Sequence, residues 1–464
     1  MDTERALEVF RRRLEGAGLC DEALRAFEHM YGAYRRGETG KVAWEEVVPP
    51  SPEDLVEWDA LGSNEFQRSG HANLGRLIWI VLNGGLGTSM KLDRAKSIVP
   101  VKDGLSFLDL IAQHVLALRR SWKRELPVLF MNSFATRDDT LASLAHYPLA
   151  VALRGGQSLP PDFLQHRFPR IREADGSPFG DPKDDSAWAP PGHGNLYLAL
   201  RCSGALKMLL ESGVRWAFVS NADNLGASPH PLLLGYMSLR GFDFLMEVTP
   251  KTAADVKGGT LVRRDRTLEL LEIAQVPAEH LDDFQDTRNF PAFNTNNVWV
   301  DLEALDAHMD RGSLDLPIIV NRKRVGDTQI VQLESAMGAA IALFPRAGGV
   351  LVPRSRFAPV KTTDDLLVRR SDAYIRGDDS PLAPNPARDP SLGPPRVRLD
   401  PLYYGSVPDL DLRIPHPPSL LRTSSLEVFG DVRFGRDVVV EGDVRVRAEV
   451  SQQLYIEDGS VLSG

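Results

Sequence analysis

The sequence predicts an α/β protein in which helices are layered on a mixed, largely parallel sheet, followed by a small unit of short strands. From about residue 70 onward, apolar runs of strand length alternate with helical stretches. One such run, at 77–82, leads into Gly84, Gly85 and Gly87, as a strand does where it enters a tight loop. Near the C-terminus a Gly-Asp-Val step recurs at a spacing of twelve residues. These three patterns favour a layered domain with a β-rich appendage.

The composition is that of a globular protein without a strongly charged surface. Of its 464 residues, 43% are apolar and 25% are charged, and the length suggests about three domains. The net charge of −9, with both signs interspersed, argues against nucleic acid or an anionic membrane as partners. No apolar run approaches the length of a membrane span. Two cysteines, Cys20 and Cys202, cannot build a disulfide framework, and a reducing cytosol is the simplest setting.

The N-terminal segment, residues 1–70, is expected to be mainly helical and polar. Its first residues form an amphipathic pattern with Leu7, Phe10 and Leu14 on one side. They carry charges throughout and lack the apolar centre of a signal peptide. A proline cluster at 49–52 ends this segment's helical pattern.

The layered domain follows. We expect strands at 128–131, 216–220 and 242–248, and a helix at 199–211. Ligands of such sheets collect at the carboxyl ends of the strands. The glycine loop and the run SNADN at 220–224 each follow a strand-like run directly. Both should therefore lie on the same rim of the sheet.

The last part of the chain changes in character. Residues 376–398 are rich in Pro, Asp, Gly and Ser, which predicts a linker. Beyond them, VFGDVRF at 428–434 and VEGDVRV at 440–446 repeat the Gly-Asp-Val step with alternating apolar positions. Short strands at a fixed period suggest coils of a β-helix. A pair of hairpins would give the same pattern.

The glycine loop is the first candidate for chemistry. Glycines leave backbone N–H groups unscreened, so that a phosphate can approach them, and Lys96 downstream adds positive charge. A Walker-A loop is excluded because its Lys-Ser pair must follow the last glycine directly, whereas here the pair stands at 96–97. A plain strand-to-helix turn is the alternative.

The run LNGGLGTSM at 82–90, with Lys96-Ser97 behind it, resembles the opening motif of the eukaryotic-type UTP:glucose-1-phosphate uridylyltransferases. Further blocks match this family in order, over about 79–367 and again in the C-terminal tail. They are MNSF at 131–134, RFPRI at 167–171, PPGHG at 190–194, SNADNLGA at 220–227, MEVT at 246–249, DVKGGT at 255–260, EIAQVP at 272–277, FNTNN at 293–297, QLE at 332–334 and VPRSRFAPVKTTDDL at 352–366. The interval 91–95 departs from the family's usual GCKGP, which leaves the path of the loop open.

The resemblance implies a Rossmann-like nucleotidyltransferase domain at 71–375 and a β-helix domain at 399–464, joined by the linker. It implies a cytosolic enzyme that makes UDP-glucose and pyrophosphate from UTP and glucose 1-phosphate by direct in-line displacement. The reacting groups are two polyanions, so that such an enzyme must mainly offset charge and align the reactants. The cofactor implied is Mg²⁺.

The family's functional residues map onto this sequence by motif. The resemblance makes Lys96 and Lys361 catalytic at the phosphates, although a lysine is by default a solvated surface residue. It makes Asp223 the Mg²⁺ ligand, although an aspartate there could equally hydrogen-bond its own turn. The residues implied to bind the nucleotide are Leu82, Asn83, Gly84, Gly85, Gln165, Gly192, Asn221 and Asp223. Those implied to bind the sugar phosphate are His193, Gly259, Glu272 and Asn296.

Each of these assignments has an alternative in which the residue has no functional role. Gln165 would read the edge of uracil with an amide, but a lone glutamine is normally an exposed residue. His193 would donate to the sugar phosphate, but a lone histidine is more often a satisfied structural one. The asparagines at 294–297 could instead cap turns, and the Pro-Gly segment at 190–194 could be a plain turn.

Two other functions remain open at this stage. One is uridylyl transfer to another sugar 1-phosphate, such as galactose or an N-acetylhexosamine. The other is a nucleotide-sugar-binding protein without catalysis, although a pure binder would not need Lys96, Asp223 and Lys361 together. For assembly, the family's animal and yeast members form octamers through C-terminal β-helices that continue for roughly another coil. We therefore expect a monomer or at most a weak dimer.

Overall fold

The computed structural model describes residues 2–252, 255, 258–312, 314–378 and 381–464. Its centre is a sheet of eight strands in which neighbouring strands run parallel, except where β14 pairs antiparallel with both of its neighbours. The mixed, largely parallel sheet predicted from sequence is therefore confirmed. In spatial order the strands are β1 (Leu55–Glu57), β17 (Ala347–Leu351), β11 (Phe244–Pro250), β14 (Ala292–Asp301), β10 (Trp216–Asn221), β2 (Leu77–Asn83), β5 (Val128–Asn132) and β6 (Asp162–Leu164).

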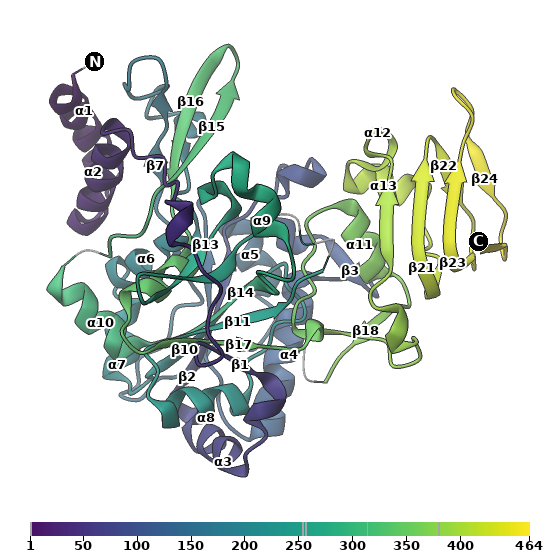
Figure 1. Ribbon diagram of the computed structural model, residues 1–464, viewed down its shortest axis with the longest axis horizontal. Coiled ribbons are helices and arrows are strands. Elements are labelled where there is room, and N and C mark those ends of the chain that lie inside the picture. Colours follow the sequence, from purple (N-terminus) through teal and green to yellow (C-terminus); the bar gives the residue numbers. More distant parts are fainter. Residues whose placement is uncertain (1, 253–254, 256–257, 313, 379–380) are drawn as a thin grey trace.

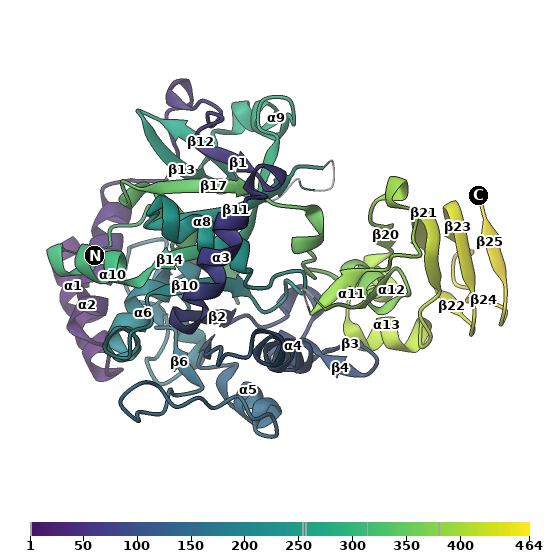
Figure 2. The same cartoon turned by 90° about the horizontal axis from the view of Figure 1, so that it is seen from below.

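Helices cover both faces of this sheet, and β2 shows why its sequence is apolar throughout. Trp79 and Val81 pack into one core and Ile78 and Ile80 into another, so that every residue of β2 is buried. The first core also takes side chains from α3 (Asn64–Asn73), α4 (Phe107–Trp122) and α8 (Pro231–Arg240). The second takes side chains from α6 (Leu196–Cys202), α7 (Ala205–Glu211) and α10 (Leu302–Arg311). Figures 1 and 2 show the two layers of helices from two directions.

The predicted elements of this domain are largely found. The strands expected at 128–131, 216–220 and 242–248 are β5, β10 and β11, the last starting at Phe244. The single helix expected at 199–211 is wrong, because α6 ends at Cys202 and α7 begins at Ala205. Gly204 lies between them at a φ of +78°, which leaves the α-helical region and turns the chain.

The N-terminal segment begins with two helices, α1 (Thr3–Gly16) and α2 (Asp21–Arg35). Phe10 and Leu14 are buried as predicted, and Leu7 is partly buried at the edge of the same cluster. The segment also supplies β1 to the sheet, which the helical pattern did not predict. A disulfide joins Cys20 to Cys202, at the start of α2 and the end of α6. The low cysteine count gave no indication of this bond.

Small strand pairs and short helices complete the layered domain. The pairs are β3 (Pro100–Lys102) with β4 (Leu105–Ser106), β7 (Phe168–Pro169) with β9 (Trp188–Ala189), β12 (Thr260–Arg264) with β13 (Thr267–Leu271), and β18 (Tyr374–Arg376) with β19 (Leu382–Pro384). A three-stranded sheet contains β15 (Ile319–Val325), β16 (Thr328–Glu334) and β8 (Ile171–Arg172). The remaining helices here are α5 (Arg137–Leu144), α9 (Leu281–Gln285) and α11 (Thr363–Arg370).

The C-terminal strands stack in parallel, which supports coils of a β-helix and rules out the pair of hairpins. One sheet contains β20 (Arg396–Leu399), β21 (Ser419–Phe429), β23 (Val439–Arg447) and β25 (Val461–Ser463), and a second contains β22 (Val432–Phe434) and β24 (Leu454–Ile456). The twelve-residue step is not the coil period, because Leu426 pairs with Val444 and Val432 with Leu454. The first Gly-Asp step lies in a turn and the second inside β23. Two short helices, α12 (Pro401–Tyr404) and α13 (Val407–Arg413), flank the first coil.

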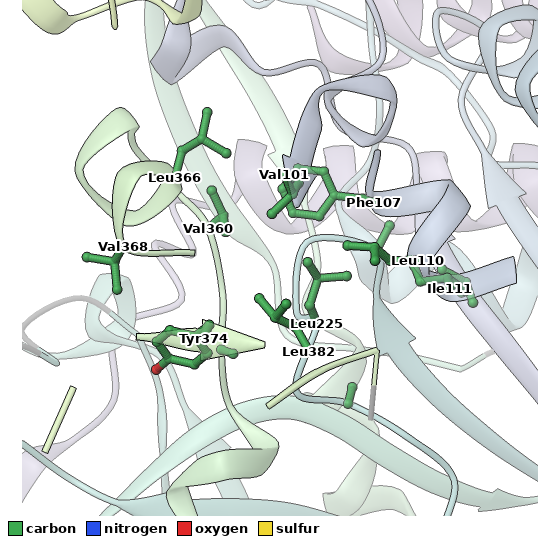
Figure 3. Packing of buried hydrophobic residues seen from close by; sticks show 14 of the residues in the cluster. Val101, Phe107, Leu110, Ile111, Leu225, Val360, Leu366, Val368, Tyr374 and Leu382 are labelled. Atoms are coloured by element: carbon green, nitrogen blue, oxygen red, sulfur yellow. The ribbon is translucent and has the colours of Figure 1, made fainter. Parts of the chain in front are cut away.

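One apolar cluster runs from the sheet into these coils, and it holds the loops that matter for function. Figure 3 shows Leu225 and Val360 packed among Phe107, Leu110 and Leu382. Leu225 lies two positions after Asp223, and Val360 directly precedes Lys361. The backbone N–H of Leu382 donates to the carbonyl of Leu225 at 3.0 Å, which ties the β18–β19 hairpin to this loop. Among the described residues, no helix is long and apolar enough to cross a membrane.

Candidate active site

Four parallel strands end at one edge of the sheet, and the predicted nucleotide residues gather there. Asn83, Asn132 and Asn221 close β2, β5 and β10, and Gln165 directly follows β6. A cavity of about 450 Å³ opens at this edge. Of the predicted residues it is lined by Leu82, Asn83, Gly84, Gly85, Lys96, Gln165, Gly192, His193, Asn221 and Asp223. The expectation that the glycine loop and the SNADN run share one rim is confirmed, because Asn221 pairs with Leu82 in neighbouring parallel strands.

A three-residue charge centre lies at this rim. Asp223 accepts hydrogen bonds at Oδ2 from Lys96 Nζ at 2.6 Å and from Lys361 Nζ at 3.2 Å. Burial alone would raise the pKa of the Asp223 carboxyl, but the two lysines outweigh it and hold the pKa well below its usual range. The same pairing raises the pKa of Lys361. The side chain of Lys361 is 61% exposed against 13% for Lys96, so that Lys361 is the more accessible cation.

Asp223 also meets the chemical requirement for a magnesium ligand. Its second carboxylate oxygen, Oδ1, is buried and has no hydrogen-bond partner among the described residues. Leaving such an oxygen unpaired costs free energy unless a ligand uses it. One or two carboxylates together with substrate phosphates are the usual protein share of a Mg²⁺ site. The donor set here therefore fits a magnesium ion bound between Asp223 and phosphate oxygens.

The turn that presents Asp223 is held from below by buried polar groups. The Asn224 side chain donates from Nδ2 to Asn297 Oδ1 and to the Arg356 carbonyl, both at 3.2 Å. The guanidinium of Arg356 in turn donates to the fully buried carboxylate of Glu247, from Nε at 2.8 Å and from Nη2 at 2.7 Å. On the other side, the N–H of Val360 donates to the Asp223 carbonyl at 3.1 Å. The segment leading to Lys361 is thereby fastened to the same turn.

The predicted base-binding residues meet across the cavity. Gln165 donates from Nε2 to the Gly192 carbonyl at 2.7 Å, which fixes the orientation of the amide. A Cβ on Gly84 would lie 2.6 Å from Gln165 Oε1, so that only glycine leaves the amide its place. Gly192 itself has a φ of +78°, and a Cβ there would lie 2.4 Å from the Ser335 carbonyl oxygen. The side-chain Nδ2 of Asn83 is already engaged inside the protein, because it donates to Asn132 Oδ1 and Thr140 Oγ1.

His193 has a defined tautomer. Its Nδ1 accepts a hydrogen bond from the backbone N–H of Met337 at 2.9 Å. Because a backbone amide can only donate, the ring proton is on Nε2. Burial lowers the pKa of His193 to about 4, with Lys361 contributing, so that the ring is neutral near pH 7. A neutral ring with this tautomer still offers one N–H donor at the cavity wall.

Asn296, Gly259 and Glu272, unlike His193, are not among the residues that line the cavity; Asn296 is joined to the lining residue Asn221 by a hydrogen bond. Asn296 adopts a φ of +60°, uncommon for a non-glycine residue, at an irregularity where β14 has extra residues opposite β11. Its Nδ2 donates to Asn221 Oδ1 at 2.9 Å, and its buried Oδ1 has no partner among the described residues. Gly259 packs against Glu272, since a Cβ there would lie 3.0 Å from Glu272 Oε1. Burial raises the pKa of Glu272 to about 7.

Sequence reasoning missed several residues of this site. Arg170, Lys323, Gln332 and Glu334 also line the cavity. Arg170, Gln332 and Glu334 lie in blocks that matched the family, and that match was the available signal for them. Lys323 lies in β15, outside every matching block. Glu247 and Arg356 also lie in matching blocks, but nothing in the sequence indicates that they pair beneath Asn224.

Known proteins resemble this chain along nearly all of its length. The family described as UTP–glucose-1-phosphate uridylyltransferase matches residues 24–441. The chain is 40% identical to the UTP–glucose-1-phosphate uridylyltransferase of Solanum tuberosum, covering 94% of this chain and 91% of that protein. It is 37% identical to the Saccharomyces cerevisiae enzyme of the same name, covering 97% and 91%. It superposes on a UDP-glucose pyrophosphorylase variant from Leishmania major, in complex with UDP-glucose, with a TM-score of 0.90 at 36% identity, covering 99% and 98%.

Proposed function

Because the chain belongs to the UTP–glucose-1-phosphate uridylyltransferase family, we propose that it transfers the uridylyl group of UTP to glucose 1-phosphate, releasing pyrophosphate and forming UDP-glucose. One observation carries the proposal for this chain. Lys96 and Lys361 meet on Asp223 at the carboxyl ends of parallel strands, beside a cavity large enough for a nucleotide. A charge-offsetting set at this rim is the machinery that phosphate transfer between two anions requires.

The roles of the residues follow from their chemistry. An oxygen of the sugar phosphate attacks the α-phosphorus of UTP, and the bond to pyrophosphate breaks as the new one forms. Lys96 and Lys361 offset the charge that builds on the phosphate oxygens, which lowers the barrier without a covalent enzyme intermediate. His193 donates a hydrogen bond from its Nε2–H to the sugar phosphate. Because the ring is neutral, it adds no charge to the site and binds that anion only through this directional hydrogen bond.

The bound ion is proposed to be Mg²⁺, held by Asp223 through the oxygen that has no protein partner. When bound, the ion offsets phosphate charge and orients the leaving pyrophosphate. Lys96 and Lys361 contact the other oxygen, Oδ2, so that Oδ1 would be available to such an ion.

The remaining assignments concern recognition. Gln165, with the backbone of Leu82 to Gly85 and Gly192, is proposed to pair with the edge of uracil. Asn221 and Asn296 form one hydrogen-bonded pair that would face the ribose and hexose side of the ligand. Asn294 connects this pair to the sugar side, accepting from the Asn296 N–H and donating to the Gly259 carbonyl, both at 2.9 Å. Gly259 and Glu272 are proposed as partners of the hexose hydroxyls.

Pyrophosphate release tests this proposal directly. The full chain is given UTP and Mg²⁺ with glucose, galactose or N-acetylglucosamine 1-phosphate, and pyrophosphate is measured by a coupled assay. We expect turnover with glucose 1-phosphate to exceed the others clearly. Equal or better turnover with another sugar would overturn the glucose assignment. Binding of UDP-glucose without turnover on any sugar would leave a nucleotide-sugar-binding protein instead.

We also propose a compartment, domain boundaries and an oligomeric state. The cytosol remains our proposal for the compartment, and cell fractionation tests it. The division at residues 70, 375 and 398 is proposed from composition, with proteolysis within 376–398 as its test. A monomer or at most a weak dimer remains our proposal for the oligomeric state. Light scattering at micromolar concentration, with activity measured in the same sample, tests this; a stable octamer would contradict it.

A further inference from the structure

The only two cysteines of the chain are bonded to each other across 182 residues of sequence. Cys20 immediately precedes α2, and Cys202 is the last residue of α6, with their Cα atoms 6.2 Å apart. The bond is therefore a covalent tie between the N-terminal helix pair and the layered domain. Both cysteines are only partly buried, so that a small reagent in solution can reach them.

A third residue, His166, lies against this pair. Its Nε2 is 4.0 Å from Cys20 Sγ, and the ligand atoms of all three residues lie within 4.8 Å of one another. Asn195 Oδ1 accepts from the His166 backbone N–H at 2.8 Å and from the ring Nδ1 at 3.1 Å. An amide oxygen can only accept, so that the ring proton is on Nδ1 and the lone pair of Nε2 faces the sulfur. Burial lowers the pKa of His166, which keeps this nitrogen available as a base.

The residues around the cysteine pair are neighbours of the proposed ligand-binding residues. His166 follows Gln165, the proposed reader of uracil, and Asn195 lies two positions after His193. The helix pair packs on the next stretch of the same segment, where the rings of Phe27 and Phe168 lie 5.3 Å apart. Tyr31 adds a hydrogen bond from its hydroxyl to the Gly176 carbonyl at 2.8 Å. The helix pair thus packs against the segment that carries Gln165, which forms part of the wall of the proposed nucleotide cavity.

We propose that Cys20 and Cys202 form a thiol–disulfide switch. When a hydroperoxide oxidises the two thiols, the disulfide holds the helix pair α1–α2 more tightly against the segment that carries Gln165. In the dithiol form, His166 Nε2 takes the proton of Cys20, and the thiolate attacks the O–O bond, giving a sulfenic acid and an alcohol or water. The Cys202 thiolate then attacks that sulfur and expels hydroxide, which leaves as water. Two thiols and one hydroperoxide thus give one disulfide, one alcohol and one water, and the two electrons from sulfur reduce the O–O bond.

Reduction leaves the helix pair attached only through non-covalent contacts, which are apolar packing and hydrogen bonds such as that of Tyr31. The apolar cluster of Phe10, Phe27, Tyr31, Phe168 and Trp188 remains, so that the helices stay near the domain. A second cavity, of about 380 Å³, lies between α2, α6 and α10, and the disulfide joins two of its walls. Without the bond those walls can separate, and the segment at 165–172 loses part of its support. We expect weaker UTP binding in the reduced state, with the chemistry at Asp223 unchanged.

Hydrogen exchange on the full chain tests the structural half of the proposal, which does not depend on the proposed function. Wild-type protein is compared after reduction with a dithiol and after addition of one equivalent of hydrogen peroxide. We expect a crosslink between the peptides that contain Cys20 and Cys202, and amide exchange in 3–35 and 165–172 at least about tenfold slower in the oxidised form. The variants Cys20→Ser, Cys202→Ser and the double variant should match reduced wild type in both buffers. Equal exchange in the two wild-type states, or a redox response in the double variant, would overturn the switch.

Two further measurements distinguish the switch from alternative roles of the same three residues. His166→Gln should slow crosslink formation by about tenfold while the final crosslink still forms, since only the base is lost; an unchanged rate would remove His166 from the mechanism. Zn²⁺ is added to the reduced chain, because a Cys₂His cluster is also a zinc ligand set. Protection of 3–35 by Zn²⁺ as strong as that by oxidation would make the cluster a metal site and overturn the switch.

The kinetic half rests on the proposed function. With UTP as substrate, we expect reduction to raise KM about three- to tenfold and to leave kcat nearly unchanged, since the support behind Gln165 is lost and the charge centre is not. A fall in kcat at unchanged KM would contradict the assignment of the switch to the base pocket. Crosslinking and slower exchange without any turnover would instead overturn the proposed function and leave the switch in place.

Discussion

At the scale of single residues, the three charged groups at the rim stabilise one another's ionised forms. Asp223 lowers the free energy of both ammonium groups, and the lysines keep Asp223 ionised although it is buried. A lysine-to-alanine change therefore removes a transition-state charge and also leaves the carboxylate less compensated. Lys96 has a further structural role that Lys361 lacks, because it is only 13% exposed and its Nζ also donates to the Val360 carbonyl.

Lys361→Ala is therefore the cleaner test of the charge centre. We expect kcat to fall by about 100- to 1,000-fold, because one preorganised charge at a developing anion contributes about 3 kcal/mol or more. Circular dichroism should show an unchanged fold. Lys96→Ala should lose as much activity and also some stability. Lys207→Ala, whose side chain is 82% exposed far from the rim, is the matched control. Near wild-type turnover in Lys361→Ala at saturating Mg²⁺ and UTP would show that the residue is not catalytic.

Glu272 predicts a pH dependence of stability. Its ordinary pKa is 4.5, and burial raises it to about 7 in the folded chain. Below pH 4.5 both states hold the proton; between pH 4.5 and about 7 the unfolded chain loses it and the folded chain does not. Stability is therefore lost across this window, by about 3 kcal/mol in total, and then stays level. In Glu272→Gln this loss should be absent, so that thermal melts of the two proteins diverge from pH 5 to 8. Parallel melting curves would show that Glu272 is ionised throughout.

The residue scale is also where sequence reasoning alone was weakest. Nothing local distinguishes Lys96 or Lys361 from the chain's other lysines, and Asp223 looks like any aspartate in a turn. The resemblance to a family identified them, and the structure brings both lysines within hydrogen-bonding distance of Asp223, across 127 residues of sequence for Lys96 and 138 for Lys361. The role of Asn83 could not be read either, because its amide partners, Asn132 and Thr140, come from other elements.

At the scale of elements, the proposed base pocket depends on two segments meeting at a fixed distance. Gln165 follows β6, and Gly192 lies in the loop after β9; the hydrogen bond between them sets the direction of the amide. Cytosine exchanges one acceptor and the donor of uracil for the opposite kinds, which would leave pocket groups unpaired.

UTP should therefore be preferred over CTP by at least about a hundredfold in kcat/KM, from a few kcal/mol of unmet hydrogen bonding. Gln165→Leu should reduce that preference to about tenfold or less while the chain stays folded. Gln157→Leu, at an exposed position in another loop, is the control. Competition assays with both nucleotides give the ratio directly, and comparable use of CTP by the wild type would mean that no uracil pocket of this kind exists.

Elements were predictable where their pattern is local. A continuous apolar run followed by glycines identified β2 because a buried parallel strand needs apolar residues on both faces. The break between α6 and α7 was missed because one glycine inside a helical pattern does not decide between a tolerated residue and a turn. The coil period was misread because two Gly-Asp-Val steps occupy different places, one in a turn and one inside β23. Pairing between strands, which sequence does not record, was needed to correct it.

At the scale of the whole molecule, the layered domain and the C-terminal coils share a core. Figures 1 and 2 show the coils at the side of the domain away from α1 and α2. The apolar cluster nevertheless continues from Phe107 through Leu382 to Leu420 and Val440. The region between them, predicted as a linker from its composition, contains β19 and a residue that organises the junction, Arg388. A composition rich in proline and glycine indicates irregular backbone, and it does not reveal how tightly that backbone is packed.

Arg388 should therefore matter for the stability of the C-terminal coils and not for catalysis. Its buried guanidinium donates to the carbonyls of Gly393, Leu420, Leu421 and Thr423, at 2.7 to 2.9 Å. Arg388→Leu leaves those acceptors without their donor, and each buried unsatisfied group costs about 1–3 kcal/mol. We expect a lower melting temperature and faster hydrogen exchange in 419–447, with kcat close to wild type. Arg433→Leu, exposed on β22, should change neither. Unchanged exchange in Arg388→Leu would mean that packing alone holds the coils to the domain, since the shared core would then be sufficient without this guanidinium.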